Sequence, residues 1–292
     1  MNPRYGGRVS EDKQRASRDT AGVAQSADGI PIRFDATGRG ARALIFVHGW
    51  SCDRTYWRNQ VVAFANAYRV VTIDLAGHGE SGAGRVSWTV PSFGADVVAV
   101  ADALRLQDMV LIGHSMGGDV IVESALLLGD RVAGIVWVDT YHRLTEPETP
   151  EEVEAFLEPF QADFAAATRS LVRRMFPAST PSDLVARIVE DMSSAPPAVS
   201  LDALRHAFAN EGPVMAALPR LKIPVVAINP DYRPTDTVSL GNYGIDTVIA
   251  SGVGHFLMLE DAGQFNRLLA DVLATRIPRT DPSVGIAQGP RV

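Results

Sequence analysis

The sequence contains a single cysteine, Cys52, among 292 residues, which excludes a disulfide within the chain. No stretch approaches the ~20 consecutive apolar residues that a membrane-spanning helix needs. The first 25 residues are polar and charged, and they lack the apolar core of a secretory signal peptide. We therefore expect a soluble, cytoplasmic protein in which Cys52 is a small buried side chain.

An excess of positive charge is lacking as well. The formal net charge is −7, with 27 Lys and Arg against 34 Asp and Glu, which argues against binding to nucleic acid or to an anionic membrane surface. No Cys and His cluster has metal-ligand spacing, and no glycine-rich phosphate-binding motif is present. We expect no cofactor, no nucleic-acid partner and no membrane partner. The oligomeric state stays open.

The chain does contain a series of short apolar runs rich in β-branched residues. Most are separated by segments with helical periodicity, the pattern of a parallel sheet covered on both faces. A polar residue follows most runs, at the strand ends where open α/β sheets bind ligands. The sequence thus predicts a doubly wound, mostly parallel α/β sheet with strands in residues 43–47, 68–74, 109–112, 133–138, 223–228 and 247–251.

Residues 113–118, Gly-His-Ser-Met-Gly-Gly, follow the third of these runs and precede a helical segment that starts at Asp119. A Gly-x-Ser-x-Gly turn between strand and helix is tight, so the residues two before and two after the serine must lack bulk. Gly113 and Gly117 meet that condition. The turn would expose the Ser115 hydroxyl above the sheet, beside the positive N-terminus of the next helix.

Four elements in this order resemble the α/β-hydrolase superfamily over roughly residues 26–276. They are residues 48–50 (His-Gly-Trp), Asp74 with the Gly-His-Gly of residues 77–79 and Ser81, residues 113–118, and residues 254–256 (Gly-His-Phe). The resemblance implies an α/β-hydrolase fold of the serine esterase or lactonase type. It also implies a helical cap inserted after the strand that follows the nucleophile helix.

A serine hydroxyl becomes a good nucleophile only with a base within hydrogen-bond reach. The resemblance implies that His48, His78 and His114 hold loops in place, while His142 and His206 fall in the inserted segment. His255 follows the last strand in a glycine-rich loop that permits close approach to Ser115. We therefore assign Ser115 as nucleophile and His255 as general base and acid.

Two backbone N–H groups are expected to form the oxyanion hole. One belongs to Met116, directly after the nucleophile, and the other to Trp50, directly after His48-Gly49. The Trp50 ring is a candidate wall of the substrate pocket, His48 is placed beside that pocket, and Ser51 is a weaker candidate for an additional polar contact.

The acid of the triad has more than one candidate. The commonest position in the resembling family lies a few residues past the strand ending at Ile228, where this chain has Arg233, with Asp231 two residues earlier. Another family position is the end of the strand after the nucleophile helix, where Asp139 stands. We favour Asp139 and keep Asp231 as the alternative, ahead of Asp236. Asp74 is expected to orient the loop at residues 77–79.

Residues 141–218 interrupt the alternation of strands and helices and read as helices only. Thr149, Pro150 and Glu152 form a helix start with a capping box, and a third helix is expected near Ser200. An apolar stripe recurs every fourth residue after the first start. We expect its members to line the substrate pocket from above: Phe156, Phe160 and Phe164.

The predicted organisation is one hydrolase core, residues 26–140 and 219–277, with a helical cap at residues 141–218 and disordered tails at residues 1–25 and 278–292. The predicted activity is cofactor-free hydrolysis of a small-molecule carboxylic ester, lactone or thioester through an acyl-enzyme at Ser115. A carbon–carbon bond hydrolase or a perhydrolase would use the same residues. A non-catalytic receptor on the same fold is the alternative from a different class.

Overall fold

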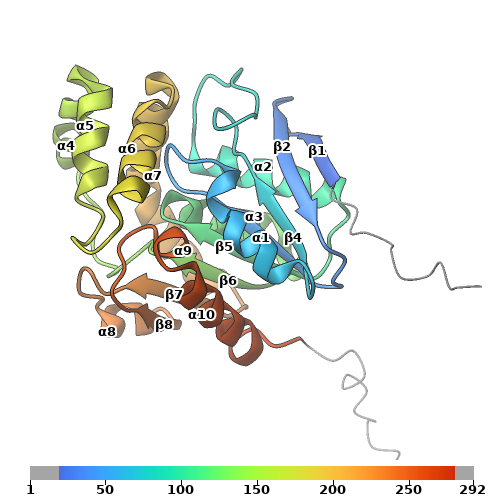
Figure 1. Ribbon diagram of the computed structural model, residues 1–292. Coiled ribbons are helices and arrows are strands. Elements are labelled where there is room, and N and C mark those ends of the chain that lie inside the picture. Colours follow the sequence, from blue (N-terminus) through green and yellow to red (C-terminus); the bar gives the residue numbers. More distant parts are fainter. Residues whose placement is uncertain (1–19, 280–292) are drawn as a thin grey trace, which may run out of the picture.

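Eight strands form one sheet in the spatial order β1-β2-β4-β3-β5-β6-β7-β8 (Figure 1). This computed structural model describes residues 20–279. The strands from β3 to β8 run parallel, and β1 and β2 are antiparallel to their neighbours. The strands are β1 (Thr20–Gln25), β2 (Pro31–Thr37), β3 (Ala43–Val47), β4 (Arg69–Ile73), β5 (Met109–His114), β6 (Val132–Val138), β7 (Val225–Pro230) and β8 (Ile245–Ala250).

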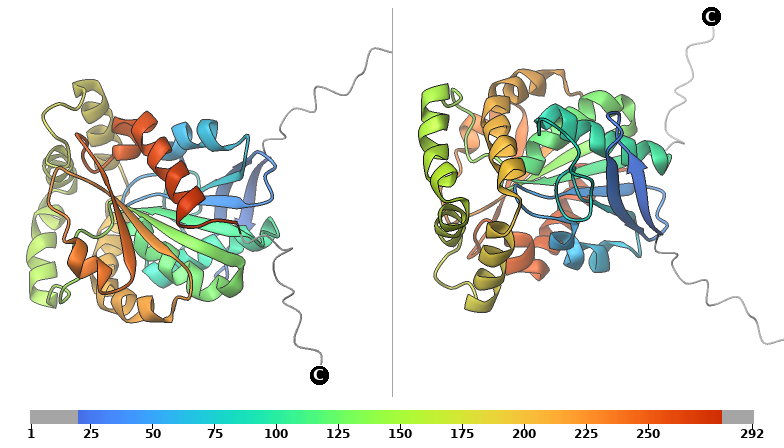
Figure 2. Two further views of the ribbon diagram at one scale, coloured as in Figure 1. Left: turned by 90° about the horizontal axis from the view of Figure 1, so that it is seen from below. Right: turned by 90° about the horizontal axis from the view of Figure 1, so that it is seen from above.

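Helices cover both faces of the sheet, as the continuous apolar strands require. Helices α1 (Arg58–Phe64) and α10 (Ala262–Thr275) lie on one face, and α2 (Val90–Ala103) and α3 (Met116–Leu128) lie on the other (Figure 2). All six residues of β5 are buried, which explains why this strand is apolar throughout rather than alternating. The predicted doubly wound, mostly parallel sheet is confirmed.

The order of the strands places a switch point between β3 and β5. The chain leaves β3 toward β4 on one side and returns at β5 on the other side of β3. At such a point the loops after the two strands diverge and leave a crevice at the carboxyl end of the sheet. The loop after β3 carries Gly49 and Trp50, and the turn after β5 carries Ser115.

The β1–β2 hairpin begins earlier than the sequence analysis placed the folded core. Residues 20–25 were assigned to a disordered tail, and that boundary was wrong because Thr20–Gln25 pair with Pro31–Ala36 as an edge strand. Small side chains dominate β1 and polar residues stand at its two ends, so its sequence gave only a weak strand signal. Most of the two predicted tails, residues 1–19 and 280–292, lies outside the described residues.

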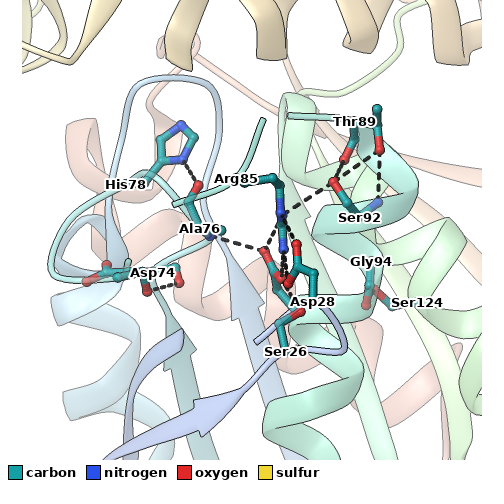
Figure 3. A network of polar contacts seen from close by, with 12 residues as sticks. Ser26, Asp28, Asp74, Ala76, His78, Arg85, Thr89, Ser92, Gly94 and Ser124 are labelled. Atoms are coloured by element: carbon teal, nitrogen blue, oxygen red, sulfur yellow. Dashed lines mark hydrogen bonds and ion pairs between the residues drawn. The ribbon is translucent and has the colours of Figure 1, made fainter. Parts of the chain in front are cut away.

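A buried ion pair anchors this hairpin to the sheet. The side chain of Arg85 is 5% exposed and donates to both oxygens of Asp96 at 2.6 and 3.1 Å, and Asp96 is fully buried at the centre of α2. Ser26, at the hairpin turn, donates to the same carboxylate at 2.6 Å. Asp28 accepts from the Arg85 Nε at 2.7 Å (Figure 3). The hairpin, the loop before α2 and α2 itself therefore share one polar network.

Four helices are inserted between β6 and β7, where three were expected. They gather at the end of the molecule opposite the β1–β2 hairpin (Figure 2). The capping box at Thr149 and Glu152 is confirmed at the start of the first of them. Asp163 has φ −150 and caps a new helix, so the expected single stripe is split before Phe164. The helices are α4 (Pro150–Ala162), α5 (Phe164–Arg173), α6 (Ser182–Ser193) and α7 (Pro197–Ala217).

Two short helices complete the chain near the carboxyl ends of the last strands. They are α8 (Thr237–Gly241), between β7 and β8, and α9 (Leu257–Glu260), which follows β8 and precedes α10. Within residues 20–279, no helix has the length and apolar character needed to cross a bilayer.

Candidate active site

Ser115 sits at a strained turn between β5 and α3. Its backbone has φ 51 and ψ −122, a region that non-glycine residues rarely adopt. A Cβ on Gly113 would lie 2.2 Å from the Gly117 carbonyl oxygen, and one on Gly117 would lie 2.6 Å from the Val47 carbonyl oxygen. A side chain at either position would collide with neighbouring backbone atoms, so both positions require glycine. This is the steric reason predicted for the Gly-x-Ser-x-Gly motif.

Two elements lie against the serine, the start of α3 and the loop after β3. Met116 is the first residue of α3, so its N–H has no acceptor within the helix. A Cβ on Gly49 would lie 3.2 Å from the Ser115 Cβ, which brings the loop carrying Trp50 directly against the serine. The Trp50 indole donates to the Ser200 carbonyl oxygen at 2.7 Å, and the Ser51 hydroxyl bonds the Ser200 hydroxyl at 2.9 Å. Helix α7 thereby holds this loop.

His255 is held by its backbone in the loop between β8 and α9. Its N–H donates to the Met175 carbonyl oxygen at 2.9 Å, and its own carbonyl oxygen contacts His114 Nε2 at 2.9 Å. The ring of His255 lies against that of His114, with the centroids 4.5 Å apart. Burial and the neighbouring His255 lower the pKa of His114 to about 3. His114 is therefore a neutral neighbour of His255.

Asp139 faces His255 from the end of β6. The Nδ1 of His255 is 2.5 Å from Oδ2 of Asp139, and the carboxylate is fully buried. Burial alone would raise the pKa of Asp139, but the charge of His255 and hydrogen bonds from His142 and His255 lower it below its ordinary value. Asp139 also has a left-handed backbone, with φ 47. The predicted contact between this aspartate and the far nitrogen of His255 is present.

The other candidate acids lie elsewhere. Asp231 accepts from the Gly252 N–H at 2.8 Å, and Asp236 accepts from the Ser239 N–H at 2.9 Å as the cap of α8. Asp74 accepts from the backbone N–H groups of Arg54 and Glu80, at 2.7 and 2.9 Å. Asp231 is thus bonded to the loop after β8 and Asp236 caps α8, while Asp74 orients its own loop as expected.

A second histidine meets the Asp139 carboxylate, and the sequence analysis missed it. His142 Nε2 contacts Asp139 Oδ1, and His142 Nδ1 lies 3.0 Å from the Thr235 hydroxyl. The only local signal was the spacing of three residues between Asp139 and His142, which does not by itself predict contact outside a helix. His206 lies apart, with its Nε2 3.0 Å from the Ser87 hydroxyl.

A cavity of about 150 Å³ opens beside Ser115. Trp50, Ser115 and Met116 form its floor, together with residues at the start of α3 and the end of β6. Helix α7 forms its opposite wall. The remaining lining residues are Asp119, Thr140, Tyr141, Leu204, Ala207, Phe208 and Glu211.

Trp50, predicted as a pocket wall, lines this cavity, whereas the other predicted pocket residues do not, and for them the prediction was wrong. His48 is fully buried and accepts from the Leu75 N–H at 3.0 Å. Phe160 and Phe164 pack against the Trp50 ring, each with centroids 5.9 Å apart, and Phe156 is 38% exposed. The break at Asp163 places Phe164 on a different helix from Phe156 and Phe160, and the contacts with Trp50 place Phe160 and Phe164 behind the cavity wall. The spacing of Leu204, Phe208 and Glu211 along one helix face was the signal for the true wall.

Two carboxyl groups in this cavity have raised pKa values. Burial raises the pKa of Asp119 to about 7, although the Tyr141 hydroxyl donates to it at 2.7 Å. Burial and the nearby Glu148 carboxyl raise the pKa of Glu211 to about 8. The cavity is therefore polar on the side away from Trp50, and its charge changes around neutral pH. Within residues 20–279, no group of three or more His, Cys, Asp or Glu is arranged to hold a metal ion.

This fold and site define a class of protein. The sequence pattern of the alpha/beta hydrolase fold family matches residues 42–202, which is more than half of the chain. The chain therefore belongs to the α/β-hydrolase family.

Similarity to individual proteins extends over most of the chain at low identity. The chain is 24% identical over 256 residues to 3-oxoadipate enol-lactonase 2 of Acinetobacter baylyi, covering 85% of this chain and 95% of that protein. It is similar in structure to Est816, described as an N-acyl homoserine lactone degrading enzyme, with a TM-score of 0.74 and 27% identity over 85% of this chain and 98% of Est816.

An esterase from Exiguobacterium antarcticum shares the fold, with a TM-score of 0.78 and 19% identity over 87% of this chain and 99% of that one. Three curated relatives with 33–36% identity match over shorter segments, which span 33–41% of the length of those proteins.

Proposed function

We propose that this protein is a serine hydrolase that cleaves a small carboxylic ester or lactone through an acyl-enzyme at Ser115. The observation that carries the proposal is the 2.5 Å contact between His255 Nδ1 and Asp139 Oδ2 beside a serine held at φ 51. Membership of the α/β-hydrolase family supports it. In this proposal Asp139 is the acid, and Trp50 and Met116 supply the oxyanion hole.

Acylation begins when His255 Nε2 accepts the Ser115 hydroxyl proton while Oγ attacks the substrate carbonyl carbon. The imidazolium that forms is stabilised by the Asp139 carboxylate at Nδ1. The carbonyl oxygen becomes negative and accepts hydrogen bonds from the Met116 and Trp50 N–H groups. The intermediate collapses when the alcohol oxygen takes the proton from His255 Nε2 and leaves.

Deacylation repeats these steps with water as the nucleophile. His255 Nε2 accepts a proton from water, and the resulting hydroxide attacks the acyl carbon. Ser115 Oγ then leaves and recovers its proton from His255. In a lactone the leaving alcohol stays attached to the acyl group, so the product is one hydroxy acid instead of an acid and an alcohol.

The cavity beside Ser115 supports a small substituent. Its volume of about 150 Å³ is well below the ~300–1,000 Å³ of sites that enclose drug-sized ligands. We also assign residues 141–218 to a cap over the site, because α7 lines the cavity with Leu204 and Phe208 and holds Trp50 through Ser200. The 27% identity to Est816 makes short N-acyl homoserine lactones the first lactones to assay.

The proposal is tested by activity and by labelling of the serine. Purified protein should hydrolyse p-nitrophenyl acetate and react with a fluorophosphonate probe in a 1:1 ratio. Ser115→Ala should abolish both, and Ser81→Ala, whose hydroxyl bonds the Asp74 carbonyl oxygen, should retain both. Labelling of another serine would refute the assignment. Binding of esters without turnover would favour a receptor, and turnover confined to β-diketone-like substrates would favour a carbon–carbon bond hydrolase.

A further inference from the structure

Asp139 uses both of its carboxylate oxygens in the buried site. Oδ2 faces His255 Nδ1, and Oδ1 faces His142 Nε2. All three residues are at least nine-tenths buried, with exposures of 1% for Asp139, 7% for His255 and 9% for His142. The carboxylate is therefore clamped between two imidazoles, and one of them has no role in the acylation chemistry described above.

The partners of the two ring nitrogens define which nitrogen of His142 carries the proton. The Asn229 side-chain amide donates to the Tyr141 carbonyl oxygen at 2.8 Å and to the Thr235 hydroxyl oxygen at 3.3 Å. Because an ionised carboxylate oxygen only accepts, the Nε2 that faces Asp139 Oδ1 carries a proton. The neutral ring can then accept at Nδ1 from the Thr235 hydroxyl, 3.0 Å away, while the Thr235 oxygen accepts from Asn229. Nδ1 then accepts and Nε2 carries the proton, which it donates to Asp139 Oδ1.

The main chain of His142 is anchored independently of its ring. Its carbonyl oxygen accepts from the Asp236 N–H at 2.7 Å, next to the start of α8. Substitution of the imidazole therefore removes one hydrogen bond to Asp139 while the backbone attachment stays in place. A substitution at this position can therefore test the side-chain contact separately from the backbone hydrogen bond.

The other charged and titratable groups around the pair are weaker partners for Oδ1. Arg233 is half-exposed, and its guanidinium lies 3.9 Å from Oδ1, beyond hydrogen-bond distance. The Tyr232 ring lies 6.1 Å from the His142 ring. Burial, the Asp139 charge and a side-chain interaction with Asp139 raise the pKa of the Tyr232 hydroxyl, so Tyr232 is a further neighbour of this carboxylate. His114 contacts the far side of His255. His142 is thus the buried donor that occupies Oδ1.

We propose that His142 is a positioning residue that fixes the Asp139 carboxylate through a relay from Asn229 and Thr235, and so sets the orientation and proton affinity of His255. This rests on the proposed function. A donor at Oδ1 withdraws negative charge from Oδ2 and keeps the carboxylate plane aligned with His255 Nδ1. Loss of the donor leaves a more basic, less oriented carboxylate, and the proton affinity of His255 rises.

The experiment measures the pH dependence of kcat and KM for p-nitrophenyl acetate, and the pH dependence of the rate of fluorophosphonate labelling. His142→Phe should lower kcat and the labelling rate by roughly 10- to 100-fold, with little change in KM. The acidic limb of both profiles should move to higher pH. His142→Gln can place an N–H near Oδ1 and should recover part of the rate and of the profile.

Variants at Thr235 and Arg233 keep the test decisive if His142→Phe folds poorly. Thr235→Val removes the donor to Nδ1 and should shift the acidic limb in the same direction by a smaller amount, whereas Thr235→Ser should behave as wild type. Arg233→Ala should shift the profile less than His142→Phe does, because the half-exposed guanidinium is 3.9 Å from Oδ1 and makes no hydrogen bond to it. A larger effect from Arg233→Ala than from His142→Phe would assign Oδ1 to Arg233 and overturn the proposal.

The outcomes separate this proposal from the proposed function. If wild-type Ser115 neither turns over the ester nor reacts with the probe, the serine hydrolase itself is rejected. If wild type is active while both His142→Phe and Thr235→Val keep its rate and pH profile, the positioning role is rejected and the hydrolase stands.

Discussion

The Trp50 indole donates a 2.7 Å hydrogen bond to the carbonyl oxygen of Ser200, which joins the loop after β3 to the inserted helix α7. The same loop carries the backbone N–H that we assign to the oxyanion hole. The inserted helices therefore do more than cover the cavity, because they hold one side of the proposed catalytic machinery in position.

Trp50→Phe should keep a ring in the cavity wall but lose this hydrogen bond. We expect a loss of about 1 kcal/mol in the free energy of unfolding and a several-fold decrease in kcat, since the Ser200 carbonyl oxygen stays buried without its donor. Urea unfolding and ester kinetics measure the two effects. Ser51→Ala, which removes the other contact to Ser200, is the matched control and should affect stability more than rate.

Asp139→Asn should lower kcat by several orders of magnitude, up to ~10⁴-fold, without unfolding the protein, because an amide holds His255 in the wrong tautomer. Asp231→Asn is the control, since Asp231 bonds the Gly252 N–H and not His255. Kinetics with p-nitrophenyl acetate and a circular dichroism spectrum of each variant check both points. Equal losses in the two variants would remove Asp139 from the triad.

Phe208→Ala should enlarge the cavity beside Ser115, because the Phe208 ring forms part of the α7 wall. We expect p-nitrophenyl hexanoate and octanoate to gain in kcat/KM relative to the acetate. Leu157→Ala, in α4 and fully buried, should cost about 2–5 kcal/mol of stability and leave chain-length preference unchanged. The same shift in both variants would point to general loosening of the inserted helices.

Asp119→Asn should change how stability depends on pH. Burial raises the pKa of Asp119 from its ordinary value of 3.8 to about 7, so the folded state binds a proton between pH 4 and 7 that the unfolded state has released. Wild type therefore loses stability as pH rises through this window, by roughly 4 kcal/mol for a shift of about three units. The variant has no such proton to lose.

Urea unfolding of both proteins from pH 4 to pH 8 measures this difference. The free energy of unfolding of the variant, relative to that of wild type, should rise up to about pH 7 and then stay constant. A constant difference across the series would place the pKa of Asp119 near its ordinary value.

Arg85→Met should destabilise the fold by about 3–5 kcal/mol, because it leaves the fully buried Asp96 carboxylate without its cation (Figure 3). Adding Asp96→Asn to this variant should recover part of the loss. Asp28→Asn should cost less than about 1 kcal/mol, since the Asp28 side chain is 44% exposed. Chemical unfolding of the three variants gives the comparison, and a small effect of Arg85→Met would contradict the account.

Local chemistry predicted the elements that position Ser115. The glycines around Ser115, the apolar run of β5 and the glycine-rich loop at His255 each depend on a few adjacent residues, because backbone bulk and strand burial act over short segments. The capping box at Thr149 was readable for the same reason. The β1–β2 hairpin was missed because an edge strand is stabilised by its partner more than by its own side chains.

Which aspartate contacts His255 was a question that only the tertiary structure decided. Asp139, Asp231 and Asp236 all follow strands whose carboxyl ends meet at one edge, so sequence position left all three open. In the folded chain Asp231 accepts from the Gly252 N–H, Asp236 caps α8, and Asp139 contacts His255.

The sequence also left open which of the inserted helices lines the cavity. Their apolar stripes were visible in the sequence, but the position of α7 determined which of them lines the cavity beside Ser115. The contact of His142 with Asp139 depends on Thr235 and Asn229, which lie about 90 residues away along the chain. Local sequence fixes the conformation of a segment through short-range sterics and hydrogen bonds, whereas the partner of a buried polar group is set by which distant segments pack beside it.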